Sequence, residues 1–524
     1  MLVRTLFLIA LSWGAVSAQA LTLDEARAVA LGEADARIAA LNKAVANADD
    51  KTAAFLQALA DDSVKTSGDK VYIVKDGKGI DPVSGAQVDV PADAEDVVSN
   101  NRMRGELDTA LGAIRLFSPD AKERAASVKA LAAEPDASRL PLVEKALQSE
   151  QVESIRAQLV LARAAILIAS DDPAKRTEAA RSLASSRDPA TKTLLLARLK
   201  EEADPAVKSA LETALREVES KLAWADRAGQ VFSGLSLGSI LLLVALGLAI
   251  TYGLMGVINM AHGELMMIGA YATYVVQGVF RSYFPGAFDW YLLAALPVAF
   301  GASAVMGAIL ERSVIRFLYG RPLETLLATW GISLMLMQGV RTVFGAQNVG
   351  VENPSWMSGG VVVMGALQLP WNRIVIIGFA LAVLAGMAWL IARTRLGLFV
   401  RGVTQNRPIA SCMGVNTARI DTYAFALGSG IAGLAGCALS QIGNVGPDLG
   451  QGYIVDSFMV VVLGGVGQLA GTVYAALGLG ILNKFLEGWA GAVLAKIAVL
   501  VFIIVFIQKR PQGIFAVKGR SAEA

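Results

Sequence analysis

The polar residues best suited to chemistry lie inside an apolar stretch, YGLMGVINMAHGELMMIGAYATY, at residues 252–274. Asn259, His262 and Glu264 end a run that has no acidic or basic side chain between residues 228 and 261. An amide, an imidazole and a carboxylate together supply hydrogen-bond donors and acceptors. Polar groups at membrane depth are tolerated only beside protein or water, so a polar, glycine-rich break between apolar spans is typical of a permeation or binding feature. A role in a cytoplasmic loop is the alternative.

The sequence offers little for enzymatic chemistry. His262 is the only histidine, and neither a metal-ligand cluster nor a nucleophile motif is present. No basic surface with interleaved aromatic residues suggests nucleic-acid binding. The two cysteines, Cys412 and Cys437, lie among apolar residues and are expected to be small apolar fillers. The chain is therefore expected not to be an enzyme, with no catalytic residue, no metal site and no cofactor.

The composition divides the chain into unlike halves, which the net charge of +2 conceals. Residues 1–20 have one Arg, an apolar core and a small-residue Ala-x-Ala end, so they predict a signal peptide, with an uncleaved anchor as the alternative. Residues 21–228 are Ala-rich and charged and predict an exported helical domain. Residues 229–516 are dominated by apolar runs and predict a membrane domain, with 517–524 as a cytoplasmic tail.

The exported half has helical periodicity over 21–60 and again over 106–218. Residues 70–90 have β-branched residues and turn signals that predict a small hairpin. AKERAASVKALAAEPDA, from Ala121, resembles AKRTEAARSLASSRDPA, from Ala174, about one two-helix unit further on. This similarity predicts HEAT-type repeats, with an irregular helical bundle as the alternative. The charged residues are expected on solvated helix faces, and a docking or gating role is the sharper hypothesis.

The membrane half contains runs long enough to cross a bilayer, which needs about 20 residues. The candidates are 232–251, 265–280, 290–310, 325–344, 374–392, 422–442, 457–482 and 490–508. Arginines at 312–321 and 393–419 and the basic residues at 509–520 predict cytoplasmic loops and tail. Eight spans would leave the tail outside, unless the run 457–482 is two helices broken at GGVGQLAG. The predicted fold is therefore an all-α polytopic helical protein with eight or nine spans and an exported helical, HEAT-like domain.

Several motifs, in order, resemble the permease subunits of branched-chain amino-acid-type ABC importers. They are YGLMGVINMAHGELMMIGAY from Tyr252, ERSVIRFLYGRPLE from Glu311, the segment from Arg393 to Phe425, VVLGGVGQLAGTVYAALGLGIL from Val461 and RPQGIF from Arg510. The segment LLATWGISLMLMQGVRTVFGAQNVGVENPSWMSGG from Leu326, together with the long N-terminal extension, is most similar to the urea-type members.

This resemblance implies a multi-pass protein of the bacterial inner membrane that imports urea. The expected partners are cytoplasmic ATP-binding subunits, a second permease subunit, a periplasmic solute-binding protein and membrane lipid, and no nucleic acid. The chain has no G-x-x-x-x-G-K-[ST] motif, so ATP hydrolysis is assigned to other chains.

The same resemblance implies an ATPase-docking element with a short helix near 408–414. The docking candidates are Arg407, Ala410, Gly414, Val415 and Asn416, and the candidates for the translocation path are Asn259, His262, Glu264, Gln441 and Asn444. Three alternatives stay open. The same machinery could carry branched-chain amino acids or short amides, the chain could be a secondary transporter or channel, or it could be a membrane-anchored scaffold.

Overall fold

The computed structural model describes residues 21–46, 50–75, 78–91, 93–133, 135–256, 259–363, 367–510 and 513–515. The predicted signal peptide, residues 1–20, and the predicted tail, residues 517–524, lie outside these residues. The chain divides into two compact units, an N-terminal unit, Met1–Leu222, and a membrane unit, Ala223–Ala524. The division falls within the long helix α10, Pro205–Met255, which also contains the expected boundary near residue 228.

The N-terminal unit begins with three helices where the sequence predicted helix over 21–60. They are α1 (Leu23–Ala30), α2 (Ala34–Ala46) and α3 (Asp50–Ala60). Thr22 starts α1 with a capping box, since its hydroxyl accepts from the backbone of Glu25 and the Glu25 side chain accepts in return. Gly32, at φ +110°, ends the first helical segment in a conformation that favours glycine.

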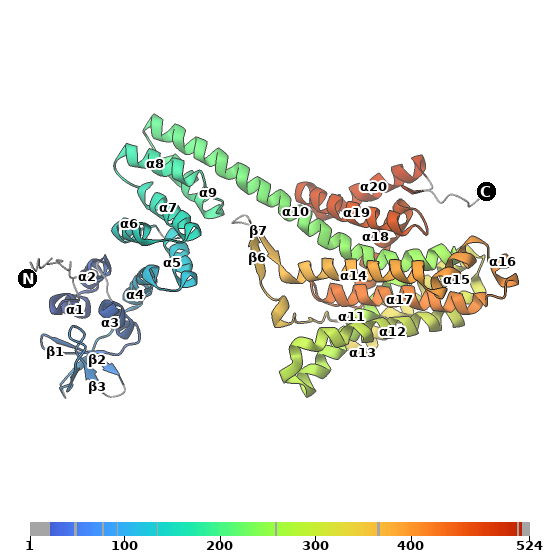
Figure 1. Ribbon diagram of the computed structural model, residues 1–524, viewed down its shortest axis with the longest axis horizontal. Coiled ribbons are helices and arrows are strands. Elements are labelled where there is room, and N and C mark those ends of the chain that lie inside the picture. The colour runs from blue at the N-terminus through green and yellow to red at the C-terminus, as the bar shows by residue number, and fades with distance from the viewer. Residues whose placement is uncertain are drawn as a thin grey trace, which may run out of the picture. The chain divides into compact units, whose positions relative to one another are not determined.

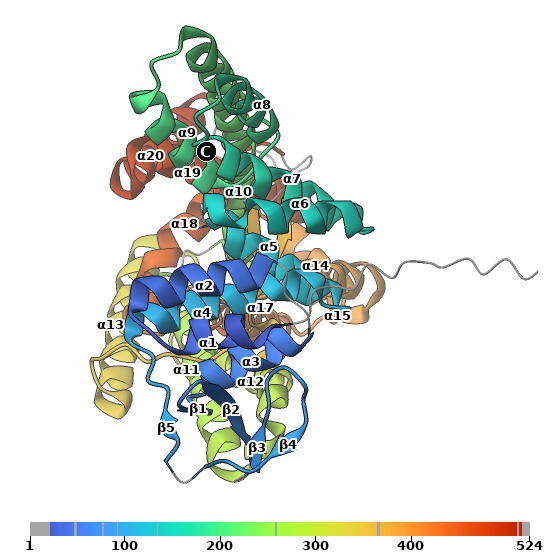
Figure 2. The ribbon, with the colours of Figure 1, turned by 90° about the vertical axis from the view of Figure 1, so that its left-hand side faces the viewer.

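A small antiparallel sheet follows, and it is larger than the predicted hairpin at 70–90. Its strands are β1 (Val64–Ser67), β2 (Lys70–Lys75), β3 (Lys78–Ile80), β4 (Gln87–Val88) and β5 (Glu95–Asp96), in the order β4-β3-β2-β1-β5. β2 lies against α1 and α3, as Figure 2 shows. The hairpin prediction was incomplete because β1 reads VKTS, a segment without the apolar alternation typical of a strand.

The rest of the N-terminal unit is helical. In chain order its elements are α4 (Asn101–Ile114), the 3₁₀ turn η1 (Arg115–Phe117), α5 (Ala121–Ala133), the 3₁₀ turn η2 (Ala137–Arg139), α6 (Leu140–Ser149), α7 (Glu153–Leu167), α8 (Pro173–Leu183) and α9 (Pro189–Glu201). The side chains of Asp136, Asp172 and Asp188 each accept a backbone N–H at the start of a helical segment. Such caps satisfy donors that the first turn leaves without a helical partner.

These helices form two copies of a repeat of 52 residues. Buried Leu131, Val143, Ile155 and Leu159 have buried counterparts 52 positions later, at Leu183, Leu195, Val207 and Leu211. Each copy has three helices: α5, α6 and α7, then α8, α9 and the first turns of α10. The predicted two-helix unit was therefore wrong. The sequence match from Ala121 to Ala174 is also one residue out of register, because Ala-rich helices align almost equally well at neighbouring offsets.

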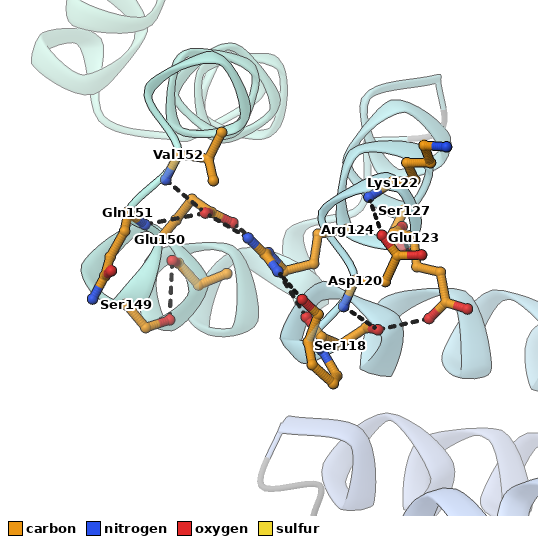
Figure 3. Close-up of polar contacts among 12 residues, drawn as sticks. Ser118, Asp120, Lys122, Glu123, Arg124, Ser127, Ser149, Glu150, Gln151 and Val152 are labelled. Atoms are coloured by element: carbon orange, nitrogen blue, oxygen red, sulfur yellow. Dashed lines mark hydrogen bonds and ion pairs between the residues drawn. The ribbon is translucent and has the colours of Figure 1, made fainter.

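Each repeat contains the same buried ion pair, and Figure 3 shows the one in the first copy. Arg124 Nε and Nη2 donate to the two carboxylate oxygens of Glu150 at 2.8 and 3.1 Å, and Nη1 donates to the carbonyls of Ser118 and Pro119. In the next copy, Arg176 donates to both oxygens of Glu202 at 2.9 Å. A bidentate pair of this kind is strong and directional, so it joins the first helix of each repeat to the end of the second.

The described residues of the membrane unit form helices, 3₁₀ turns and one hairpin. After α10 come α11 (His262–Tyr283), α12 (Tyr291–Ser313), α13 (Pro322–Phe344), α14 (Trp371–Arg393), α15 (Arg395–Gln405), α16 (Arg407–Cys412), α17 (Thr417–Ser440), α18 (Leu449–Gly464), α19 (Leu469–Ala490) and α20 (Ala492–Lys509). The 3₁₀ turns are η3 (Pro285–Trp290), η4 (Ile315–Leu318) and η5 (Ser355–Met357), and β6 (Gly360–Val363) pairs with β7 (Leu367–Pro370). With these sheets present, the all-α prediction holds only as a mostly helical fold.

Seven of the described helices are long and apolar enough to cross a membrane: α10, α12, α13, α14, α17, α19 and α20. α18 is apolar but shorter, and α11 is the helix that carries the polar break. The predicted break at GGVGQLAG is present, because α18 ends at Gly464 and α19 begins at Leu469. Gly465 and Gly467 turn the chain there with φ of +98° and +78°.

Helices α11, α12 and α17 form the closely packed centre of the membrane unit (Figure 1). In α17, 78% of the most apolar stretch is buried, compared with 17% in α14 and in α20, which present apolar side chains outward. Added side chains on Gly433 and Gly436 of α17 would collide with Ala299 of α12 and Met266 of α11. Small residues at such positions let transmembrane helices approach closely.

Candidate functional site

The polar break predicted from the sequence is a buried cluster where α11 begins. α10 ends at Met255, and Asn259, His262 and Glu264 follow with exposures of 1%, 0% and 1%. An added side chain on Gly263 would collide with the backbone of Gly450, at the start of α18. The cluster is therefore enclosed by protein, as exposed backbone and polar groups at membrane depth require.

Helix α13 supplies two hydroxyl groups to the segment that carries this cluster. Ser333 Oγ donates to Glu264 Oε1 at 2.7 Å, and Thr329 Oγ1 accepts from the backbone N–H of Met260 at 3.1 Å. The buried side chains of α13 are Thr325, Thr329, Ser333 and Met337, at a spacing of four residues, whereas many of its larger apolar side chains are exposed. α13 thus turns its hydroxyl face inward and its apolar face outward.

Each of the three cluster residues keeps one polar atom free within the described part of the chain. His262 Nε2 lies 3.2 Å from the carbonyl oxygen of Val244, which can only accept, so Nε2 carries the proton and Nδ1 is a free acceptor in the neutral ring. Asn259 Oδ1 accepts from Ala261 N at 3.0 Å, and its Nδ2 donor is free. Glu264 Oε2 is also free. Buried polar atoms are normally paired, so three free ones in six residues indicate a place for water or a polar solute.

Gln441 and Asn444 are not part of this cluster. A side chain on Gly247 would meet both His262 and Gly428, which places the cluster beside the middle of α17. Gln441 lies 13 residues beyond Gly428, and at 1.5 Å per helical residue this is about 20 Å along α17. Its Oε1 accepts from Tyr291 at 3.2 Å and its carbonyl accepts from Asn372 at 3.0 Å, so it joins three helix ends. Asn444 is exposed in the following loop.

The predicted short cytoplasmic helix corresponds to α16, which begins one residue before the expected Pro408. Asn406 caps it through Ile409 N, and Gly414, at φ +84°, turns the chain out of it. Ala410 is buried, Val415 N donates to the Ala410 carbonyl, and the Asn416 side chain caps α17 through Arg419 N.

Two exposed apolar side chains at α16 were not among the predictions, and they lie close in sequence to Gly414 and Asn416, which were predicted and are exposed. Ile409 and Met413 are 61% and 79% exposed, whereas Arg407, with 38% of its side chain exposed, forms an ion pair with the buried Asp421 of α17. Of the predicted docking residues, Ala410 is buried and Arg407 is paired with Asp421, whereas Gly414 and Asn416 are exposed. The sequence signal available for this surface was the presence of apolar residues on a short helix that has polar residues on both sides.

Sequence reasoning also missed Ser333 and Thr329. Their signal was the recurrence of hydroxyl residues every four positions along an otherwise apolar helix, which places them on one face. Hydroxyl groups on one face of a helix that otherwise contacts lipid are expected to face the protein interior, because hydrocarbon offers them no hydrogen-bond partner.

Comparison with known proteins agrees with this architecture. A family profile described as the permease component of branched-chain amino acid transport systems matches residues 230–508. The high-affinity branched-chain amino acid transport system permease protein BraD of Pseudomonas aeruginosa is 27% identical over 291 residues, covering 54% of this chain and 94% of that protein. The corresponding protein LivH of Escherichia coli is 28% identical over 294 residues with the same coverage.

A more distant relative is the ribose import permease protein RbsC of Escherichia coli, 28% identical over 206 residues, covering 37% of this chain and 61% of that protein. No solved structure matches the chain. The family match takes in the polar cluster at the start of α11 and the α15–α16 segment, and it ends within α20. The chain therefore belongs to the family of permease components of branched-chain amino acid transport systems.

Proposed function

We propose that this chain is the membrane-spanning permease subunit of an ABC importer, and that urea is its solute. The observation that carries the substrate proposal is the cluster at the start of α11, with one free amide donor, one free imidazole acceptor and one free carboxylate oxygen. Urea has one carbonyl acceptor and two amino groups, so its hydrogen-bonding groups are complementary to these atoms. A small uncharged solute also needs no compensating ion pair in a buried path.

The proposed topology has nine crossings, by α10 to α14 and α17 to α20. If the N-terminal unit is exported, an odd number of crossings places the basic end of α20 on the cytoplasmic side. The Arg-rich segments around η4 and α15–α16 then lie on the same side. This agrees with the positive-inside rule. Exposed Trp224, Trp290, Trp371 and Trp489 then all lie toward the opposite side, where an aromatic belt is typical of a membrane–water interface.

The proposed partners follow from the family. Cytoplasmic ATPase subunits would bind the outer face of α16, a second permease subunit would complete the path, and a periplasmic solute-binding protein would deliver the solute. The N-terminal unit, with its two 52-residue repeats, is proposed to be exported and to act as a docking or gating domain on the periplasmic side.

The second candidate is the same machinery with a branched-chain amino acid as solute. The observation in its favour is that BraD and LivH carry this substrate class in their names. The two candidates differ in the charged groups that they carry. A branched-chain amino acid is a zwitterion: its ammonium group would pair with Glu264, but its carboxylate would lie near Glu264, and the cluster residues offer it no cation. Like charges in a buried site disfavour binding.

The test is uptake of labelled urea and labelled leucine at micromolar concentration, in cells that lack the gene and in cells where it is restored. The proposal expects restored urea uptake that collapses when ATP is depleted. Restored leucine uptake alone would replace the solute and keep the machinery. ATP-independent uptake of either solute would favour a channel or secondary transporter, and no uptake of either would favour a scaffold.

A further inference from the structure

Two carboxylates are buried at the Arg-rich end of the membrane unit, outside the cluster described above. Glu311 lies near the end of α12 and Asp421 near the start of α17, and both side chains are 0% exposed. Carboxylates are seldom fully buried in a membrane protein unless they are paired or functional. Their partners come from three separate segments.

Glu311 is the hub that joins α12 to α17. Its Oε2 accepts from Thr422 Oγ1 at 2.7 Å, and its Oε1 accepts from the Tyr319 hydroxyl at 3.2 Å. Arg316 lies 3.5 Å from the same carboxylate, with 38% of its side chain exposed. The connection between α12 and α13 is thus folded back onto the first turn of α17.

Asp421, one residue before Thr422, receives Arg407 from α16. The Arg407 guanidinium forms an ion pair with Asp421, and its central carbon lies 5.0 Å from the centre of the Tyr319 ring. Arg407 is held on both sides, by a charge and by an aromatic face. Because separating a buried pair leaves an uncompensated charge in a low-dielectric interior, α16 and the start of α17 are expected to move together.

α17 is in turn in direct backbone contact with the helix that carries the polar cluster. Side chains on Gly433 or Gly436 would collide with Ala299, Ser303 or Met266, so the helices meet at those glycines with no intervening side chains. Tightly packed interiors have low compressibility and transmit displacement. A displacement of α17 therefore reaches α11 within three helical turns of Glu264.

We propose that Arg407 and Asp421 are positioning residues that couple α16 to the transport helices, and that Arg407 does not bind the ATPase. This inference rests on the proposed ABC importer function. The outer face of α16, with Ile409 and Met413, receives the ATPase. The inner face passes its movement through the Arg407–Asp421 pair and the Glu311 hub to α17 and α12.

The experiment uses the assembled importer in proteoliposomes, with co-purification of the ATPase subunits, ATP hydrolysis and solute uptake measured on the same preparation. Arg407→Ala and Asp421→Asn are expected to retain the ATPase subunits and hydrolysis but to move roughly tenfold less solute per ATP, within the usual range of coupling between sites. The double variant is expected to be no worse than either single variant, because both remove the same link. Arg419→Ala, which removes an exposed arginine from the start of α17, is the matched control and is expected to couple normally.

Arg407→Met combined with Asp421→Met guards against loss of folding, because replacing a buried ion pair with apolar residues is often neutral for stability. It is expected to fold, bind the ATPase and remain uncoupled. Normal solute movement per ATP in this variant would overturn the proposal, and so would loss of ATPase co-purification in Arg407→Ala. If the wild-type chain itself neither co-purifies with an ATPase nor shows ATP-dependent uptake, the proposed function fails, and this outcome is distinct from both.

Discussion

Glu150 and Glu202 in the N-terminal unit are buried, as Glu264 is in the membrane unit, but the surroundings of their carboxylates differ. In the repeats each carboxylate receives a bidentate arginine and at least one backbone N–H, so both oxygens are occupied. Glu264 has one serine hydroxyl and one free oxygen. A saturated buried carboxylate holds helices in one arrangement, whereas an unsaturated one retains hydrogen-bonding capacity for a solute. The comparison thus distinguishes buried carboxylates that stabilise the fold from one that is free to bind a solute.

The largest expected effect is on the stability of the N-terminal repeats. Glu202→Ala leaves Arg176 buried without its carboxylate and is expected to lower the free energy of unfolding of the second repeat by about 3–5 kcal/mol. Hydrogen–deuterium exchange over α8 and α9 in the full-length protein measures this loss. Glu201→Ala, next to it and exposed, is the matched control with a change expected within about 0.5 kcal/mol. An equal effect of the two substitutions would contradict a structural role for the Arg176–Glu202 pair.

A change of pH is expected to have an intermediate effect on the stability that Glu150 and Glu202 give to the repeats. The hydrogen bonds from Arg124 and Arg176 lower the pKa of Glu150 and Glu202, against the opposing effect of burial. A carboxyl with a lowered pKa in the folded state stabilises the fold above its unfolded pKa, about 4.3 for glutamate, and this contribution is lost as pH falls through the lowered value.

The stability difference between the wild type and an E150Q/E202Q variant should therefore be constant near neutral pH and should shrink as pH falls below about 4. Exchange protection over α5 to α9, corrected for the intrinsic effect of pH on exchange, gives both curves. A difference that grows in acid would mean that the two pKa values are raised, and would break the contrast between saturated and unsaturated carboxylates.

The smallest expected effect is at the one hydroxyl that Glu264 does use. Ser333→Ala removes a single hydrogen bond, worth about 1 kcal/mol, and is expected to lower uptake about fivefold. Thr342→Ala, an exposed hydroxyl on the same helix, is expected to leave uptake unchanged. Equal uptake in both variants would show that α13 does not position the carboxylate.

The sequence was informative wherever local chemistry decides structure. The glycines at 464–471 predicted the break between α18 and α19, because only a flexible backbone adopts the turn that Gly465 and Gly467 make. The break before His262 was predicted for a similar reason, since polar residues interrupt an apolar run. The repeat register was one residue wrong, since it is fixed by the pairing of Arg176 with Glu202, which a local alignment does not contain.

Partners that depend on tertiary packing could not be predicted. Arg407 was predicted to contact the ATPase, which stays a prediction, but its ion pair with Asp421, fourteen residues away and on another helix, has no signal in the local sequence. Gln441 and Asn444 were predicted to lie on the same translocation path as Glu264, and that role stays a prediction. The distance of Gln441 from the cluster depends on which part of α17 contacts α11, and this is set by the glycine contacts between the helices.

The most direct test of the account is uptake by the assembled importer carrying Glu264→Gln, a variant that keeps the size of the side chain and an acceptor for Ser333 but removes the free carboxylate oxygen. Glu324→Gln, exposed at the start of α13, is the control. The account predicts that Glu264→Gln lowers uptake about tenfold while the ATPase subunits still co-purify normally, and that Glu324→Gln leaves uptake unchanged. Wild-type uptake in Glu264→Gln would contradict the claim that the cluster at the start of α11 lies on the transport path.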